Sequence, residues 1–301
     1  MRALALPMRR GLAVAVLWFA TLAGCSRPAP PPVPTPPAKI PDAPTEPMRP
    51  NSPASTSTPP PAPAALAPAA PTTESQRSYC CLYVAADAIT LDGKLDEPAW
   101  QRAAPLTDFH TSGKQPVPAS RVTTARLLWT DTHLLAAYDC RADFIQCAGQ
   151  ERDDTVWAGE AAELFLAPAG GDRPYFEFNV NPECQLYDTH IFDWHYEVMV
   201  KEWRNWAKAY NADVRCGVQV ERSPAGEPRG WTVELAVPFR DLGPDGAGSG
   251  TAPAPGSVWL FNVARAVSRP AKKVEYSCWE PTFGDFHRPF KYPRLEFVRE
   301  R

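Results

Sequence analysis

The sequence has no long run of lysine or arginine, and beyond its first residues it has no apolar segment long enough to span a membrane. Its 31 Lys and Arg residues are balanced by 34 Asp and Glu residues, for a formal net charge of -3. Because a nucleic-acid-binding protein must neutralise several phosphates, this balance argues against a nucleic-acid partner. The chain also lacks CxxC, HExxH and GxSxG motifs, which are signatures of zinc sites, zinc proteases and esterases.

Residues 1–25 have the features of an export signal. Three arginines accompany a short apolar run that ends in Leu22-Ala23-Gly24-Cys25. This ending resembles the lipobox of bacterial lipoproteins, in which Cys25 would be acylated and become the first mature residue. Ser26, directly after the cysteine, then favours a location at the outer membrane of the cell envelope. The acyl chains on the cysteine would anchor the protein there. The alternative is an ordinary cleaved signal in which Cys25 is incidental.

Residues 26–76 are rich in proline and alanine, and 18 of the 36 prolines lie between Pro28 and Pro71. Proline fixes its backbone angle and cannot donate to a β-ladder, and few apolar side chains are present to offset the entropy of ordering. The segment is therefore predicted to be a disordered tether. At about 3.1 Å per residue, it could reach on the order of 140 Å when fully extended.

Residues 77–301 form a single candidate domain, in which apolar residues mostly alternate with polar ones. This alternation is clearest at 214–220 and 231–237, which are predicted to be half-buried antiparallel strands. Further strands are expected at 124–129, 134–139, 162–167, 175–181, 257–265, 274–279 and 294–298, and short helices only at 96–102 and 197–207. Many short strands with almost no helix predict an all-β fold, an antiparallel β-sandwich of two packed sheets of the immunoglobulin or jelly-roll kind.

Seven cysteines follow Cys25 in the sequence. An exported chain meets an oxidising compartment, so some of them are expected to pair, and Cys140 with Cys147 could close one loop. Seven cysteines cannot all pair within one chain. The remaining pairing stays open at this stage.

A candidate metal site is the segment 188–195, where Asp188, His190 and His195 could project toward one ion. The spacing has neither the HExxH pattern nor a fixed third ligand. An exposed strand followed by a loop explains the same residues, so no metal is predicted.

Five segments occur in the order seen in one family of binding domains. They are 89–100, 157–166, 231–238, 261–265 and 279–289. Over about residues 88–298 the chain resembles the family 9 carbohydrate-binding modules and their relatives in the wider DOMON-like superfamily. The resemblance implies a β-sandwich whose ligand slot lies between two tryptophans that grip the end of a sugar chain.

The same resemblance assigns candidate sugar-binding residues. Trp157 and Trp279 match the two tryptophans, Glu163 matches a carboxylate that hydrogen-bonds sugar hydroxyls, and Glu177, Asn179, Arg265 and His287 lie near the matching site. A pyranose has apolar faces and a polar edge, so aromatic planes suit its faces while carboxylate, amide and guanidinium groups suit its edge. The segment Lys291-Tyr292-Pro293 departs from the Phe-Gly that usually follows the histidine. The alternative for the tryptophans is a place in the core, as expected for Trp100, Trp231 and Trp259.

The function predicted from these observations is non-catalytic carbohydrate binding by a monomeric, membrane-anchored lipoprotein that supports polysaccharide capture or degradation. One alternative is an enzyme acting on O-glycosyl bonds, which needs two carboxyls roughly 5 to 9.5 Å apart. A second is a haem-binding DOMON-like domain, for which Met199 is the only methionine after Met48. A third is an envelope scaffold with an empty slot. No cofactor is predicted; members of the family often hold structural calcium, but no ligand set for it is matched here.

Overall fold

The computed structural model describes residues 77–111, 115–170, 174–193, 195–243, 250–271, 273–282 and 286–300. The predicted signal peptide 1–25, with Cys25, and the predicted tether 26–76 lie outside these residues. The elements are, in order, β1 (Ser78–Tyr83), α1 (Pro98–Arg102), β2 (His110–Thr111), η1 (Ala119–Arg121), β3 (Thr123–Trp129), β4 (His133–Arg141), η2 (Val156–Ala158), β5 (Ala161–Ala167), β6 (Tyr175–Val180), β7 (Leu186–Ile191), α2 (Tyr196–Ala209), β8 (Arg215–Arg222), β9 (Pro228–Pro238), η3 (Phe239–Asp241), β10 (Val258–Val267), β11 (Glu275–Cys278), η4 (Pro289–Lys291) and β12 (Arg294–Val298). Among the described residues, no helix combines the length and apolar character needed to cross a bilayer.

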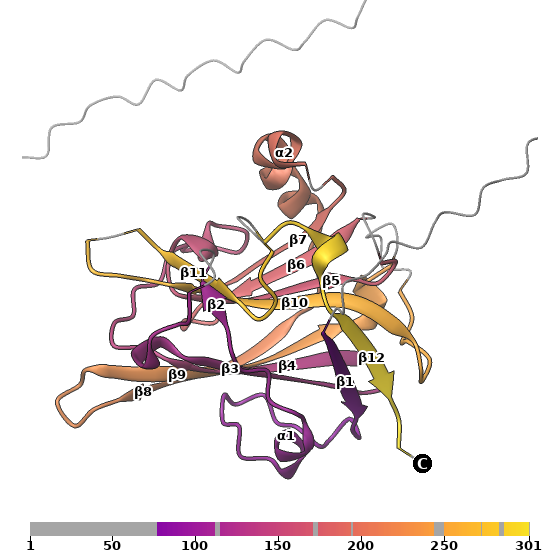
Figure 1. Cartoon of the computed structure of the whole chain (residues 1–301), viewed down its shortest axis with the longest axis horizontal. Helices are drawn as coiled ribbons and strands as arrows, with labels where there is room; N and C mark the ends of the chain where they lie inside the picture. Colours follow the sequence, from indigo (N-terminus) through magenta and orange to yellow (C-terminus); the bar gives the residue numbers. More distant parts are fainter. Residues whose placement is uncertain are drawn as a thin grey trace, which may run out of the picture. The chain divides into compact units, whose positions relative to one another are not determined.

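The strands belong to one strongly curled sheet, in the order β7-β6-β5-β10-β12-β1-β3-β4-β9-β8, with β11 and β2 attached beside β10. In Figure 1, β7, β6, β5 and β10 form an upper layer over β8, β9, β4 and β3, and β1 and β12 join the two layers at one side. The predicted all-β sandwich is confirmed. Most neighbours are antiparallel, but β1 is parallel to both β12 and β3, so the two layers are continuous through β1.

The main core lies between the two layers. Phe178 and Phe261 face it from the upper layer, and Trp129 and Leu235 face it from the lower layer. Every second residue of a strand points to the same side, so the alternating pattern of the sequence provides one apolar face per layer. Trp100, Trp231 and Trp259 are buried as expected, at 0%, 1% and 9% exposure.

The predicted strands coincide with observed ones to within a few residues at each end, and the predicted helices correspond to α1 and α2. The antiparallel pairing of the two clearest runs is found between β8 and β9. Strands β1 and β2 were not predicted, and β7 was considered only as an exposed strand, the alternative to a metal site. The strand is present, but all six of its residues are buried, so the expected exposure is wrong.

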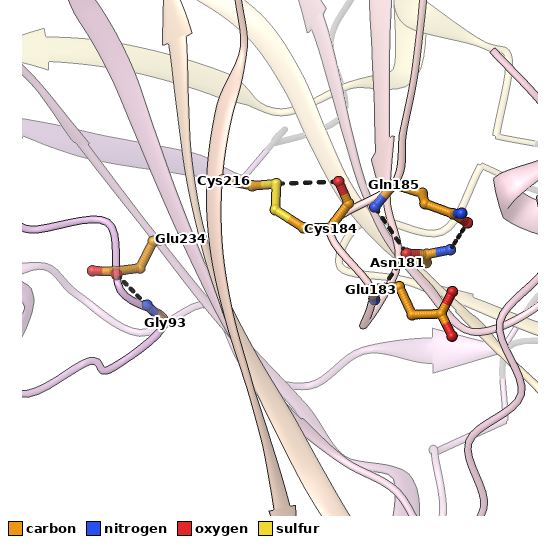
Figure 2. The surroundings of a disulfide bond; sticks show 7 residues. All are labelled: Gly93, Asn181, Glu183, Cys184, Gln185, Cys216 and Glu234. Carbon is orange, nitrogen blue, oxygen red and sulfur yellow. Dashed lines mark hydrogen bonds between the residues drawn. A yellow bond between two sulfur atoms is a disulfide. The ribbon is translucent and has the colours of Figure 1, made fainter. Parts of the chain in front are cut away.

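The segment 89–100 packs on the outer face of the lower layer, where it is tied to Glu234 of β9. One carboxylate oxygen accepts the backbone N–H groups of Asp92 and Gly93, and the other accepts the indole N–H of Trp100 at 2.8 Å. Figure 2 shows the Glu234–Gly93 bond. A Cβ on Gly93 would lie 2.4 Å from the backbone of Val218, so only glycine permits this close approach. This family-like segment therefore has a structural role.

A disulfide joins Cys184, in the turn between β6 and β7, to Cys216 of β8, with a Cα–Cα distance of 6.2 Å (Figure 2). It links the edges of the two layers across 32 residues of sequence. The suggested Cys140–Cys147 pair is not formed. Cys140 points into the main core, and Cys147 is half-buried in a loop.

Replacing both Cys184 and Cys216 with serine is expected to lower the free energy of unfolding by about 3–4 kcal/mol, because the unfolded chain regains the freedom that a loop of this length had lost. Urea denaturation of the double variant measures the loss. The matched control is Cys147→Ser, which removes a free thiol and should change stability little. A double variant as stable as the parent would show that the cross-link does not constrain the chain.

Candidate functional site: an acidic floor between aromatic walls

The outer face of the upper layer, directed away from the main core, carries Glu163 of β5 and Glu177 and Asn179 of β6. Glu163 lies directly opposite Asn179, while Glu177 lies opposite Thr189 of β7. Paired residues on neighbouring strands point to the same side, so these side chains share one surface. We call Glu163, Glu177 and Asn179 the acidic floor. Three of the predicted sugar-binding residues are thus brought together.

Hydrogen bonding within the acidic floor is incomplete. The side-chain amide of Asn179 donates to Glu177 Oε1 at 2.9 Å. Glu163 Oε1 and Asn179 Oδ1 are buried and have no hydrogen-bond partner, and the residues are 2% and 0% exposed. Since a buried polar atom without a partner costs roughly 1–3 kcal/mol, two such acceptors on one surface favour a site for a ligand that donates.

The two carboxyls have raised pKa values. Burial is the main cause of the rise in the pKa of Glu163, and the nearby Glu177 raises it further. Burial also raises the pKa of Glu177, while His287 and the Asn179 amide partly oppose that rise. Burial, with contributions from both carboxyls, raises the pKa of Tyr276 to about 12. Two carboxyls whose charge is poorly compensated therefore lie beside a neutral tyrosine hydroxyl.

One wall of the acidic floor is aromatic and contains Trp157. Its ring lies 4.5 Å from that of Tyr187 on β7 and 4.9 Å from that of Trp203 on α2. The Tyr276 hydroxyl donates to the backbone oxygen of Trp157 at 3.1 Å, which ties η2 to β11. Trp157, Trp203 and Tyr276 are each partly exposed. A ligand arriving from solvent would meet this wall.

A second aromatic wall is formed by Phe165, Tyr175, Phe286 and His287, and it adjoins the first because the rings of Phe286 and Tyr276 lie 5.9 Å apart. The Tyr175 hydroxyl and His287 Nδ1 are 2.7 Å apart, and the ring of Phe165 lies 5.8 Å from that of His287. The ring of Phe286 lies 5.9 Å from that of Phe165. His287, a predicted site residue, therefore belongs to the same surface as the acidic floor.

Trp279 lies on the other side of the layer. Its neighbour Cys278 is opposite Ala264 and shares the face of Glu163, so Trp279 points into the main core. Trp279 is 8% exposed, and its ring lies 5.6 Å from that of Phe261, with the Arg77 guanidinium 5.3 Å from it. The two predicted tryptophans are thus on opposite faces of the upper layer, and the structure does not bring them together.

Arg265 is also separated from the acidic floor. It is fully buried on the core face and forms an ion pair with Glu160. Its other hydrogen bonds go to the Thr123 hydroxyl and the Arg141 backbone oxygen. Glu160 also accepts the indole N–H of Trp231 at 2.9 Å. The guanidinium predicted to face sugar is instead part of a buried polar network.

The metal candidate is not assembled either. Asp188 accepts a hydrogen bond from Arg152 and another from the Ala212 backbone, and His190 stacks on Phe176 with centroids 4.3 Å apart. No cluster of three metal-ligating side chains occurs in the part of the chain that the structure describes.

Six aromatic residues of the walls were not among the predicted sugar-binding residues: Phe165, Tyr175, Tyr187, Trp203, Tyr276 and Phe286. Tyr187 and Tyr276 lie on strands, where successive side chains point to opposite faces of the sheet. The face that each one occupies depends on the pairing of its strand with β6 or β10. Trp203 and Ala207 lie four residues apart on α2, and this spacing indicated a helix face without identifying the surface it covers.

No protein-family profile matches the chain, and no curated protein matches it. Comparison with solved structures does give matches. A family 9 carbohydrate-binding module from Caldicellulosiruptor kristjanssonii, in complex with cellotriose, is 13% identical with a TM-score of 0.51 over 73% of this chain and 94% of the module. The chain has the fold of family 9 carbohydrate-binding modules.

Two further structures support this fold assignment. The Caldicellulosiruptor module in complex with glucose matches at 13% identity and a TM-score of 0.50, over 73% of this chain and 96% of the module. A proposed carbohydrate-binding protein from Bacteroides uniformis matches at 17% identity and a TM-score of 0.53, over 74% of this chain and all of that one. Identities this low establish the shared carbohydrate-binding-module fold and leave the ligand of this chain to be argued from its own residues.

Proposed function

We propose that this protein binds an oligosaccharide or polysaccharide, without cleaving it, at the acidic floor between the two aromatic walls. The observation that carries the proposal is the pair of buried, unpartnered acceptors, Glu163 Oε1 and Asn179 Oδ1. A polar floor with apolar walls is the usual composition of a small-ligand site. The structural neighbours, which are named as carbohydrate-binding, point to the same class of ligand.

The chemistry of a pyranose fits this arrangement. Its hydroxyls can donate to the unpartnered oxygens of Glu163 and Asn179, and its apolar face can rest on the Trp157 ring. A sugar held between two aromatic rings, as predicted, requires a second ring on the same side of the layer as Trp157. Trp203 and Tyr276 are the partly exposed aromatic residues there, and we propose that they take the place expected for Trp279.

The proposal includes a location in the cell envelope. Acylation of Cys25 would anchor the chain at the outer membrane, and the tether 26–76 would let the domain reach polysaccharide and contribute to its capture. The Cys184–Cys216 disulfide supports an oxidising compartment, since such bonds are rare in reducing ones.

Replacing Trp157 with alanine should weaken saccharide binding by about 2 kcal/mol, roughly 30-fold, because a partly exposed aromatic anchor at the site is lost. Calorimetric titration of the full chain with cello- and xylo-oligosaccharides measures the affinity. Product analysis of the same mixtures should show intact oligosaccharides.

Two control variants accompany Trp157→Ala. Tyr83→Ala removes an aromatic ring at the far end of β1, where it packs on Trp129, and should leave the affinity unchanged. Trp279→Ala should lower the melting temperature, because this ring fills the core. If Trp157→Ala binds as tightly as the parent, the aromatic wall is not part of the site. Absence of binding to every saccharide would favour a scaffold role.

A further inference from the structure

The acidic floor has more hydrogen-bond acceptors than donors. Glu163 and Glu177 accept when ionised, and an Asn179 amide hydrogen is already donated to Glu177. Glu163 Oε1 and Asn179 Oδ1 remain without a donor. A ligand that completes this floor must bring several donors close together.

The charge of the acidic floor is equally one-sided. Glu163 and Glu177 lie on adjacent strands and on the same face, two positions apart along the ladder. Glu177 raises the pKa of Glu163, and His287 partly opposes the rise in the pKa of Glu177. Other polar groups on this face are the hydroxyls of Thr189, which lies opposite Glu177, and of Tyr187 and Tyr276, together with the Cys278 thiol. Two buried carboxyls beside one histidine are further stabilised by a ligand that supplies a positive charge.

We infer that the saccharide recognised by this site carries a free amino group, held as an ammonium between Glu163, Glu177 and the Asn179 carbonyl. This inference rests on the proposed function and specifies its ligand. An ammonium offers three donors at one centre together with a positive charge, so it matches both properties of the floor. An N-acetylated amine has lost that charge, and a uronic acid would add a third carboxylate beside two others.

The test is calorimetric titration of the full chain with four ligands of equal length: oligomers of glucosamine, of N-acetylglucosamine and of glucose, and an oligouronate. The glucosamine oligomer is expected to bind at least about tenfold more tightly than the glucose oligomer, with no binding of the uronate. Because burial raises the pKa of both carboxyls, an ammonium bound beside them should lower those pKa values and release protons, detected by comparing buffers with different ionisation enthalpies.

Glu163→Gln should abolish the preference for the amine and the proton release, and Glu177→Gln provides a second variant should the first fold poorly. Glu221→Gln, which removes an exposed carboxylate of β8, is the control for general attraction between a polycation and an acidic protein. A glucose oligomer that binds as tightly as the glucosamine oligomer overturns the inference while the proposed function stands. Equal weakening by Glu221→Gln and Glu163→Gln would also overturn it. Binding of none of the four would remove both.

Discussion

Arg265→Met is expected to lower the free energy of unfolding by about 3–5 kcal/mol, since it leaves Glu160 charged and buried without its cation. The guanidinium donates twice to Glu160 Oε1, and both side chains are fully buried. Trp231 and Ser268 would still donate to the Glu160 carboxylate, but neither carries a positive charge. Urea denaturation monitored by tryptophan fluorescence measures the loss.

The control for this variant is Arg141→Met, which removes a salt bridge to Glu221 whose partners are 54% and 57% exposed. It should cost less than about 1 kcal/mol because water already screens that pair. A double variant, Arg265→Met with Glu160→Gln, should recover part of the stability, since no net charge is then left buried. Equal losses for Arg265→Met and Arg141→Met would contradict the structural role assigned to the buried pair.

Glu163→Gln is expected to have opposite effects on binding and stability. Saccharide affinity should fall by about 1.5–3 kcal/mol, the usual contribution of a hydrogen bond to a charged group. The free energy of unfolding at neutral pH should rise, because the substitution removes an ionisable carboxyl from a buried position. A loss of affinity together with a gain in the free energy of unfolding would show that Glu163 contributes to binding and destabilises the fold.

The stability gain should depend on pH. Burial raises the pKa of Glu163 well above its ordinary value of 4.5, so the folded protein holds this proton more tightly than the unfolded chain. The contribution of Glu163 to stability is therefore fully present below pH 4.5 and is lost as the pH rises through the folded-state pKa. Glu163→Gln should accordingly match the parent near pH 4 and exceed it increasingly above that, as followed by melting temperature. A gain that is the same at every pH would contradict the buried-carboxyl account.

Much of the fold could be predicted because the strand pattern is local. A strand buried on one face must alternate apolar and polar residues, and runs such as 231–237 do so regardless of their partners. Strand β7 was considered only as an exposed strand because its residues are polar, whereas both of its faces are buried, one against α2 and the other against the core. The parallel pairing of β1 with β12 joins residues more than two hundred positions apart, and no local pattern records it.

The site was predicted only in part, because local sequence patterns can be read from the sequence and pairing between distant strands cannot. Glu163, Glu177 and Asn179 are odd-numbered residues on two neighbouring strands, so a hairpin register is enough to place them on one face. Trp279 and Arg265 were expected beside them, yet both point into the core. In each case the choice of side was set by the register of β10 with β5 and β11. A register shift of one residue would reverse every side chain of a strand, and residue type alone does not determine that register.

The amino-acid pattern alone was enough for the all-β fold class, the proline-rich composition of residues 26–76, and the presence of carboxylates and aromatic residues that suit a sugar. These features depend on composition and on neighbours within a few positions. Only the tertiary structure decided which of these groups face one another. Pairing between distant strands and the packing of α2 against β7 bring Trp157, Trp203 and Tyr276 around the acidic floor, because the side of a sheet on which a residue lies is fixed by its partner strands.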